Sequence, residues 1–201
     1  MSVRGPTIPN LPLDGLMNPD LQDLLQRAMD ATQRDALEQS EALCQQAIAL
    51  APGAAMPHFL RATNFAHAGN YELAEACYTA CLNRAPDFAI ARFQLGLMQV
   101  TGGRAALGQA SWELLLTLPD DDYLKLFAQG FMLLLADQWG PARAAIERGI
   151  ARNTTNAPLN DDMRGVLQRM AVARAGADAA EAEAEASASG AHFLLGAYRQ
   201  Q

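Results

Sequence analysis

Apolar residues recur three and four positions apart along most of the chain, from Leu21 to about Gly176. This spacing places them on one face of an α-helix, and the alternation typical of β-strands is almost absent. Gly and Pro residues interrupt the pattern and mark the ends of the helices. The sequence therefore predicts an all-α body.

The two ends of the chain lack this pattern. Residues 1–19 hold four prolines, which favour an extended N-terminal arm because proline continues neither a helix nor a sheet. Residues 177–190 are rich in Ala and Glu and contain no large apolar side chain, so we expect a linker. Residues 191–201 then carry an apolar cluster, which predicts a helix that docks on this protein or on a separate partner. The cluster consists of Phe193, Leu194, Leu195 and Tyr198.

A 34-residue period runs through the body. Gly69 and Gly103 are separated by this period, and so are Tyr78 and Trp112. Further pairs and triplets share it: Pro52 and Pro86, Tyr71 with Ala105 and Trp139, and Ala74 with Gly108 and Ala142. Self-similarity at a fixed period predicts stacked units that bury their apolar faces on one another.

The stretch "RATNFAHAGNYELAEACYTACLNRAPD" (residues 61–87) resembles a tetratricopeptide repeat (TPR). Gly69 and Tyr71 match the turn of the family, Ala74 its small contact residue, Tyr78 its aromatic and Pro86 its closing proline. The resemblance implies a bacterial TPR protein with a right-handed α-solenoid of helix pairs in residues 20–176. Four repeats are expected at about 21–54, 55–88, 89–122 and 123–156, the first and fourth degenerate.

A capping helix is expected over residues 160–175, because the last repeat of a solenoid needs its apolar face covered. Asn160 or Asp161 would begin this helix, since both side chains accept hydrogen bonds from free backbone amides. The "LPDDDY" segment is interpreted in the same way, with Asp120–Asp122 as the start of the fourth repeat rather than a cation site.

In TPR proteins the first helix of each pair lines a concave surface, so the resemblance implies which residues face a ligand. Apolar residues at helical spacing are often core, but Tyr78, Leu95, Trp112 and Ile146 already supply internal packing here. We therefore expect an accessible apolar wall. Its partner-binding residues would be Leu25, Met29, Met56, Phe59, Thr63, Ile90, Phe93, Leu97, Leu124, Phe127 and Phe131.

This wall predicts an adaptor or chaperone that binds an apolar or helical protein segment in the concave groove. The Lys, Arg and Asn residues with which chaperone-binding relatives hold a terminal carboxylate are absent from these columns. Size, acidity and groove character resemble the bacterial chaperones of secretion-system translocators. The alternative is a self-assembly module, whose groove is filled by residues 191–201 in cis or in a homodimer.

Charge and composition restrict the partners. The chain holds 22 acidic and 15 basic residues, and its net charge of -7 argues against a nucleic-acid partner. It has no apolar run near 18 residues, so membrane insertion is not expected. Three cysteines and the absence of a signal sequence indicate a cytoplasmic protein, and the Ala-rich, Lys-poor composition is typical of bacteria.

No group of residues predicts catalysis. Cys77 and Cys81 lie four apart on one helix, but neither His58 nor His67 has the spacing to complete a four-ligand metal site. The Gly102–Gly103 pair lacks the strand and the Gly-Lys-Ser/Thr ending of a phosphate-binding loop. We therefore expect a non-enzyme that needs no metal and no cofactor.

Overall fold

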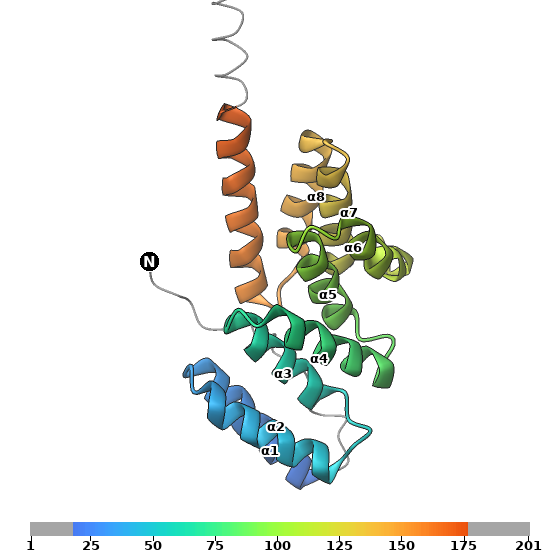
Figure 1. Cartoon of the computed structure of the whole chain (residues 1–201). Helices are drawn as coiled ribbons and strands as arrows, with labels where there is room; N and C mark the ends of the chain where they lie inside the picture. The colour runs from blue at the N-terminus through green and yellow to red at the C-terminus, as the bar shows by residue number, and fades with distance from the viewer. Residues whose placement is uncertain (1–17, 177–201) are drawn as a thin grey trace, which may run out of the picture. The chain divides into compact units, whose positions relative to one another are not determined.

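The computed structural model describes residues 18–176. The expected linker at 177–190, the docking helix at 191–201 and nearly all of the N-terminal arm lie outside the described residues. The described part is all helical, as predicted, with nine α-helices, one 3₁₀-helix and no strand (Figure 1). Its elements are α1 Pro19–Gln33, α2 Leu37–Leu50, α3 Met56–His67, α4 Tyr71–Arg84, α5 Ala89–Thr101, α6 Ala105–Trp112, η1 Glu113–Thr117, α7 Tyr123–Leu135, α8 Trp139–Arg152 and a helix over 157–176.

The helices pack in consecutive pairs. Each of α1, α3, α5 and α7, called the first helices below, packs against the next helix along the chain, α2, α4, α6 and α8, called the second helices. Successive pairs meet through α2 with α3 and α4 with α5, and the fourth pair meets the third mainly through α7 with η1. First helices also contact one another, α1 with α3 and α5 with α7. This order, which follows the colour gradient of Figure 1, makes the all-α solenoid that the repeat period predicts.

The turn within each pair uses the same backbone conformation four times. Asp35, Gly69, Gly103 and Asp137 each lie one repeat period apart, and their φ angles are 61°, 76°, 78° and 56°. Glycine adopts this left-handed region without a steric penalty, and Asp tolerates it better than most residues. The degenerate first and fourth repeats therefore keep the turn although they lack its glycine.

Side chains with oxygen acceptors begin three of the eight numbered helices. The Oδ1 atom of Asn18 accepts from the amides of Asp20 and Leu21 at the start of α1. Asn70 caps α4, and Asp122 caps α7 through the amides of Leu124 and Lys125 at 2.8 and 3.3 Å. The interpretation of "LPDDDY" as a helix start is confirmed.

The helix over 157–176 begins earlier than expected. Asn156, and not Asn160 or Asp161, precedes it, and Asn156 Oδ1 accepts from the Leu159 amide at 3.1 Å. Asn153 Nδ2 in turn donates to the carbonyl of Asn156 and to Oδ1 of Asn160, both at 2.9 Å. The sequence argument named Asn160 or Asp161 and did not consider Asn156, which is buried together with Asn153 and Asn160.

The chain divides into two compact units, Met1–Asn160 and Asp161–Gln201. All eight numbered helices belong to the first unit, and the helix over 157–176 begins there and continues into the second. The candidate site below is built from the first unit.

Candidate functional site

The expected partner-binding wall is mostly buried. Phe59, Phe93 and Phe127 have no accessible surface, although the sequence argument placed them on the open side of the first helices. Met56 and Leu97 are half-buried and keep part of their surface accessible. The other nine residues of the wall are buried: Leu25, Met29, Phe59, Thr63, Ile90, Phe93, Leu124, Phe127 and Phe131. The expectation of an open apolar wall is therefore wrong for these nine positions.

The phenylalanines of the predicted wall pack against other aromatic rings in the core. The Phe93 ring lies 6.1 Å from Trp112, 6.0 Å from Phe127 and 6.0 Å from Phe131, measured between centroids. The Trp112 indole, itself fully buried, donates its Nε1 hydrogen to the Phe93 carbonyl at 3.0 Å. These four residues join α5, α6 and α7 into one aromatic core. In the preceding repeat, Phe59 lies against Tyr78 and Phe88.

Glycines on the facing helices make room for these rings. A Cβ atom added to Gly149 of α8 would overlap the Phe127 ring, with its Cδ1 atom at 2.5 Å. A Cβ atom on Gly96 of α5 would overlap the Trp112 indole in the same way. Interiors fill such space to high density. The sequence argument counted the core positions as already filled and did not add the volume that these glycines leave to the aromatic side chains.

A smaller set of first-helix side chains remains accessible. Gln94, Leu97 and Thr101 lie three and four positions apart on α5 and therefore form one stripe, in which Thr101 is exposed and the other two are half-buried. Leu135 follows Thr101 by one repeat period and is 37% exposed at the end of α7. Met56 occupies the equivalent stripe of α3. We call Met56, Gln94, Leu97, Thr101 and Leu135 the first-helix face; it is mixed in character rather than wholly apolar.

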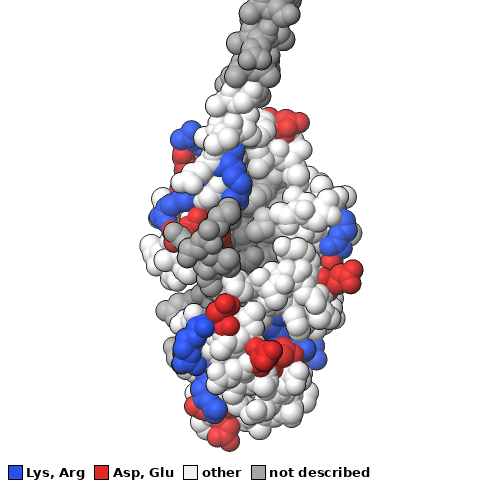
Figure 2. Space-filling view, turned by 60° about the vertical axis from the view of Figure 1, so that its left-hand side comes forward, with Lys and Arg blue, Asp and Glu red and all other residues white. Residues whose placement is uncertain are grey.

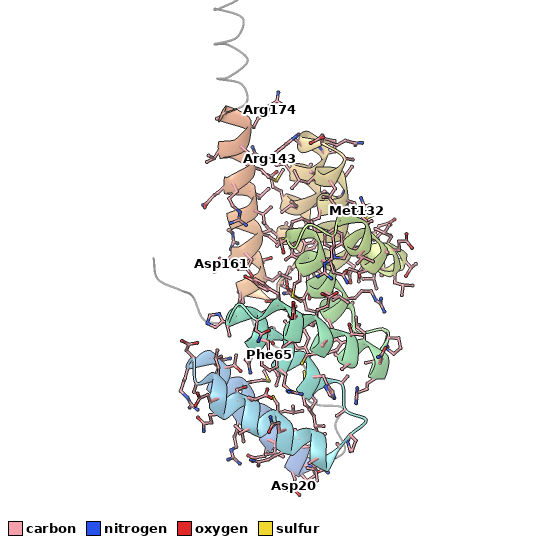
Figure 3. The ribbon with its side chains drawn as sticks, viewed as in Figure 1. Asp20, Phe65, Met132, Arg143, Asp161 and Arg174 are labelled. Carbon is pink, nitrogen blue, oxygen red and sulfur yellow. The ribbon has the colours of Figure 1, made fainter. Side chains whose placement is uncertain are left out.

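Charged contacts hold the helices that carry this face. Arg61 of α3 donates to both carboxylate oxygens of Glu41 on α2, and its Nη2 atom lies 2.7 Å from Glu41 Oε1. The same guanidinium lies 5.7 Å from the centroid of the Phe65 ring, and the hydrogen bond with Glu41 raises the pKa of Arg61. Figure 3 shows Phe65 on α3 and Met132 on α7, both half-buried residues of first helices.

A second ionic network joins α4, α5 and α6. Arg104 donates to both oxygens of Glu75, at 3.0 and 2.6 Å, and Gln99 donates to Glu75 at 3.2 Å. The Arg104 hydrogen bond is the main reason that the pKa of Glu75 is lowered. Ser111 donates to the other end of the Gln99 amide at 2.7 Å. These hydrogen bonds join the third repeat, which carries Leu97 on α5, to α4 of the second repeat, and they also join α5 to α6 within the third repeat.

Exposed apolar side chains also lie on the second helices. Leu73 of α4 and Leu107 of α6 are 46% and 52% exposed, and Tyr71 is 62% exposed. Leu73 and Leu107 are one repeat period apart, so they occupy the same place in consecutive repeats. The sequence argument did not name these leucines, although their spacing was a visible signal.

The groups that could have carried chemistry are enclosed. Cys44, Cys77 and Cys81 are free thiols in the interior, and burial raises the pKa of Cys44 and of Cys81 to about 12. Thiols with such values are poor nucleophiles and poor metal ligands near neutral pH. His58 is buried with no hydrogen-bond partner on Nε2, and its pKa is lowered by burial and then by Arg84 and Arg61. Between residues 18 and 176, no three His, Cys, Asp or Glu side chains converge as metal ligands do.

The charged surface carries both signs. On the face drawn in Figure 2, Lys and Arg lie in small groups beside Asp and Glu and form no continuous basic surface. Among residues 18–176, no helix has the length and apolar character needed to cross a membrane.

Comparison with known proteins gives matches in structure and none in sequence. No protein-family model matches the chain, and no curated protein matches it significantly. A chain of the APC/C hetero-tetramer Cut9–Hcn1 matches with a TM-score of 0.59 and 15% identity over 68% of this chain and 26% of that chain. This chain therefore spans about a quarter of the length of that relative.

Two shorter solved structures match over more of their own length. TTC0263, described as a thermophilic TPR protein of Thermus thermophilus, has a TM-score of 0.58 and 16% identity, covering 77% of this chain and 82% of that chain. YrrB, described as a TPR protein with an unusual peptide-binding site, has a TM-score of 0.52 and 16% identity, covering 65% and 67%. At these identities the likeness concerns the fold alone.

Proposed function

We propose that this chain, which has the fold of a tetratricopeptide repeat protein, is a non-catalytic adaptor that binds a segment of another protein on its first-helix face. One observation carries the proposal: Leu97 keeps accessible surface in the middle of α5, between the polar side chains of Gln94 and Thr101. Met56 and Leu135 provide further accessible apolar surface on α3 and α7. The peptide-binding site described for YrrB supports a peptide as the kind of ligand.

The chemistry of the face favours an amphipathic helix as the bound segment. Apolar anchors of such a helix recur at three- and four-residue intervals and would meet Leu97 and its apolar neighbours. Gln94 and Thr101 would supply hydrogen bonds at the edge of the contact. The nine buried residues of the predicted wall would then act indirectly, because their packing fixes the spacing of the first helices.

We further infer a role as a bacterial cytoplasmic chaperone or adaptor connected with secretion. The support is the acidic composition, the repeat architecture and the resemblance to the small chaperones of secretion-system translocators. The inert, buried thiols and the isolated, buried His58 support the absence of an enzymatic reaction.

Site-specific crosslinking tests the surface. The photo-crosslinking residue benzoylphenylalanine is placed at position 97 in one variant and at position 107 in a control variant of the full chain. Leu107 is a suitable control because it is also an accessible leucine, 52% exposed, on α6. We expect a discrete protein adduct in cells from position 97 and none from position 107.

Two substitutions provide the matched binding control. Leu97→Glu places a charge in the proposed contact and should weaken capture of the crosslinked partner at least tenfold, whereas Leu107→Glu should leave capture unchanged. Thermal unfolding of both variants shows whether either change disturbs the fold. Equal capture by the two folded variants would refute the first-helix face as the binding surface.

A further inference from the structure

We propose that the turns of the first two repeats form a second contact surface, which binds a cationic protein segment that also carries apolar side chains. The surface combines two accessible apolar side chains with three exposed carboxylates. No residue of the first-helix face belongs to it, so the inference goes beyond the proposed function. We call it the turn surface, and it consists of Asp35, Leu37, Glu38, Tyr71 and Glu72.

Two hollows of this surface lie at the same place in consecutive repeats. One is lined by residues 35–39 at the start of α2, and the other by residues 68–72 at the start of α4. Their volumes are about 470 and 450 Å³, so each has room for a Lys or Arg side chain. The Nε2 atom of His67 lies 3.1 Å from Asp35 Oδ1. Because His67 directly precedes the residues that line the second hollow, this contact makes the two hollows neighbours.

The carboxylates of the turn surface are open to solvent and available to a ligand. The side chain of Asp35 is 68% exposed, and Glu38 and Glu72 are exposed as well. In the part of the chain that the structure describes, neither of these two glutamates forms an ion pair. A cationic side chain of a ligand can therefore reach the three carboxylates without displacing a Lys or Arg of this protein.

The cations of the same region leave these carboxylates in excess. Between residues 33 and 72, Arg34 and Arg61 are the only Lys or Arg residues, and Arg61 donates to both carboxylate oxygens of Glu41. Arg34 is thus the one remaining cation for three carboxylates. The negative charge complements the Lys or Arg side chains of a ligand. It opposes a second copy of this chain, because two turn surfaces that faced each other would bring their carboxylates together.

The apolar side chains of the surface favour a ligand that is more than a simple polycation. Tyr71 is 62% exposed, and Leu37, one repeat period earlier, is half-buried. An exposed aromatic ring attracts Lys or Arg through its face and also offers apolar contact area. In the third repeat the equivalent positions hold Ala105 and Ala106, so the turn surface ends before that repeat and does not include Leu107.

A short synthetic peptide tests the surface on the full chain. The probe is a fluorescent peptide of alternating Arg and Leu, and its binding is measured by fluorescence anisotropy at about 0.1 M salt. Glu38→Gln with Glu72→Gln should weaken binding about fivefold, and Tyr71→Ser about threefold, because exposed ion pairs and cation–π contacts are modest in strength. Asp87→Asn with Glu113→Gln removes the same charge at exposed sites elsewhere and should weaken binding less than about twofold.

Several results of this binding measurement would overturn the proposal. Equal weakening by the two charge-removing pairs would show a general attraction to an acidic protein rather than a site. An unchanged affinity of the Tyr71→Ser chain would remove the aromatic contact, and a probe that does not bind at all would remove the surface. A peptide of alternating Glu and Leu should not bind, and binding as tight as that of the Arg peptide would refute charge complementarity.

Crosslinking locates the bound probe. Benzoylphenylalanine in place of Tyr71 should form an adduct with the peptide on irradiation, whereas the same residue in place of Leu114 should not. Leu114 is a suitable control because it is also an accessible apolar side chain, 55% exposed on η1. An adduct from position 114 alone would place the cationic segment elsewhere and would overturn the turn surface.

The turn surface and the proposed adaptor function fail separately. Leu97→Ser should leave the affinity for the probe unchanged, because Leu97 belongs to the first-helix face. If the probe binds the turn surface and position 97 never crosslinks a foreign protein, the adaptor function is wrong and the turn surface stands. If position 97 crosslinks a foreign protein and the probe shows no preference for the turn surface, the present inference is wrong and the adaptor function stands.

Discussion

Two glycines of α8 offer a direct measure of how tightly the aromatic core is packed. Gly149→Ala places a methyl group against the Phe127 ring, whereas Gly140→Ala in the same helix meets no atom within 4 Å. Alanine is favoured over glycine by up to about 1 kcal/mol in a helix interior, which applies to Gly149, whereas Gly140 is the second residue of α8 and precedes Pro141, where a methyl group brings no such gain. The difference in stability between the two variants is therefore a lower bound on the cost of the overlap with Phe127.

The size of the effect follows from the geometry. Phe127 has no accessible surface, and three of its ring atoms lie within 3.3 Å of the added Cβ position. Overpacking of this kind costs about 1–3 kcal/mol. For a chain of this size, each kcal/mol shifts Tm by roughly 2–4 °C, so Gly149→Ala should melt roughly 2–12 °C below Gly140→Ala.

Thermal unfolding followed by circular dichroism and by tryptophan fluorescence checks this prediction. Trp112 reports the aromatic core directly, since it lies against Phe93 and Phe131. We expect Gly140→Ala to melt close to the unmodified protein and Gly149→Ala to melt below it. A Gly149→Ala protein as stable as Gly140→Ala would refute the burial of Phe127 against α8.

Three further predictions are tested by thermal unfolding. The pKa of His58 lies below its usual 6.5 because burial disfavours the charged form, so stability is full above pH 6.5 and falls as the pH drops through the lower folded value. His58→Phe should remove much of that loss below pH 6.5, and an unchanged pH profile would show that other groups cause it. Asp137 and Gly103 both have a positive φ, which glycine adopts more easily than other residues. Asp137→Gly should therefore stabilise the protein by about 0.5–1 kcal/mol, and Gly103→Ala should destabilise it by about 1 kcal/mol. If both substitutions shifted Tm in the same direction, this account of the turns would be wrong. Asn64→Ala should lower the free energy of unfolding by about 1–3 kcal/mol, because Asn64 accepts from Thr32 at 2.9 Å and donates to Ser40 at 2.8 Å in the interior. Gln94→Ala on the accessible stripe is the control, and it should change the free energy of unfolding by less than about 0.5 kcal/mol.

The repeated architecture could be predicted from the sequence because it depends on local signals that recur. Spacing of three and four positions gives the helices, and the repeat period gives their pairing. The turns at Asp35 and Asp137 are harder to recognise because they lack the glycine, but the repeat period still identifies their positions. The start of the last helix was misplaced because Asn156, which caps it through the Leu159 amide, is held in place by two hydrogen bonds with Asn153 that a residue-by-residue comparison of caps does not reveal.

The accessible surface could not be predicted in the same way. Phe93 and Leu97 lie four positions apart on α5, both apolar and both assigned to the predicted wall. The structure buries Phe93 completely and leaves Leu97 partly accessible. Phe93 is enclosed because the rings of Trp112, Phe127 and Phe131 converge on it from α6 and α7, and the sequence of α5 alone does not contain that convergence.

The sequence by itself therefore determined the helices, their period and the turns between them, because these depend on residues close together in the chain. The tertiary structure decided which face of each first helix is core and which is surface. Which residues are buried depends on the distance between neighbouring helices. That distance is small where Gly96 packs against Trp112 and where Gly149 packs against Phe127. Residues far apart in sequence fix that distance together, so the periodicity of any single helix does not contain it.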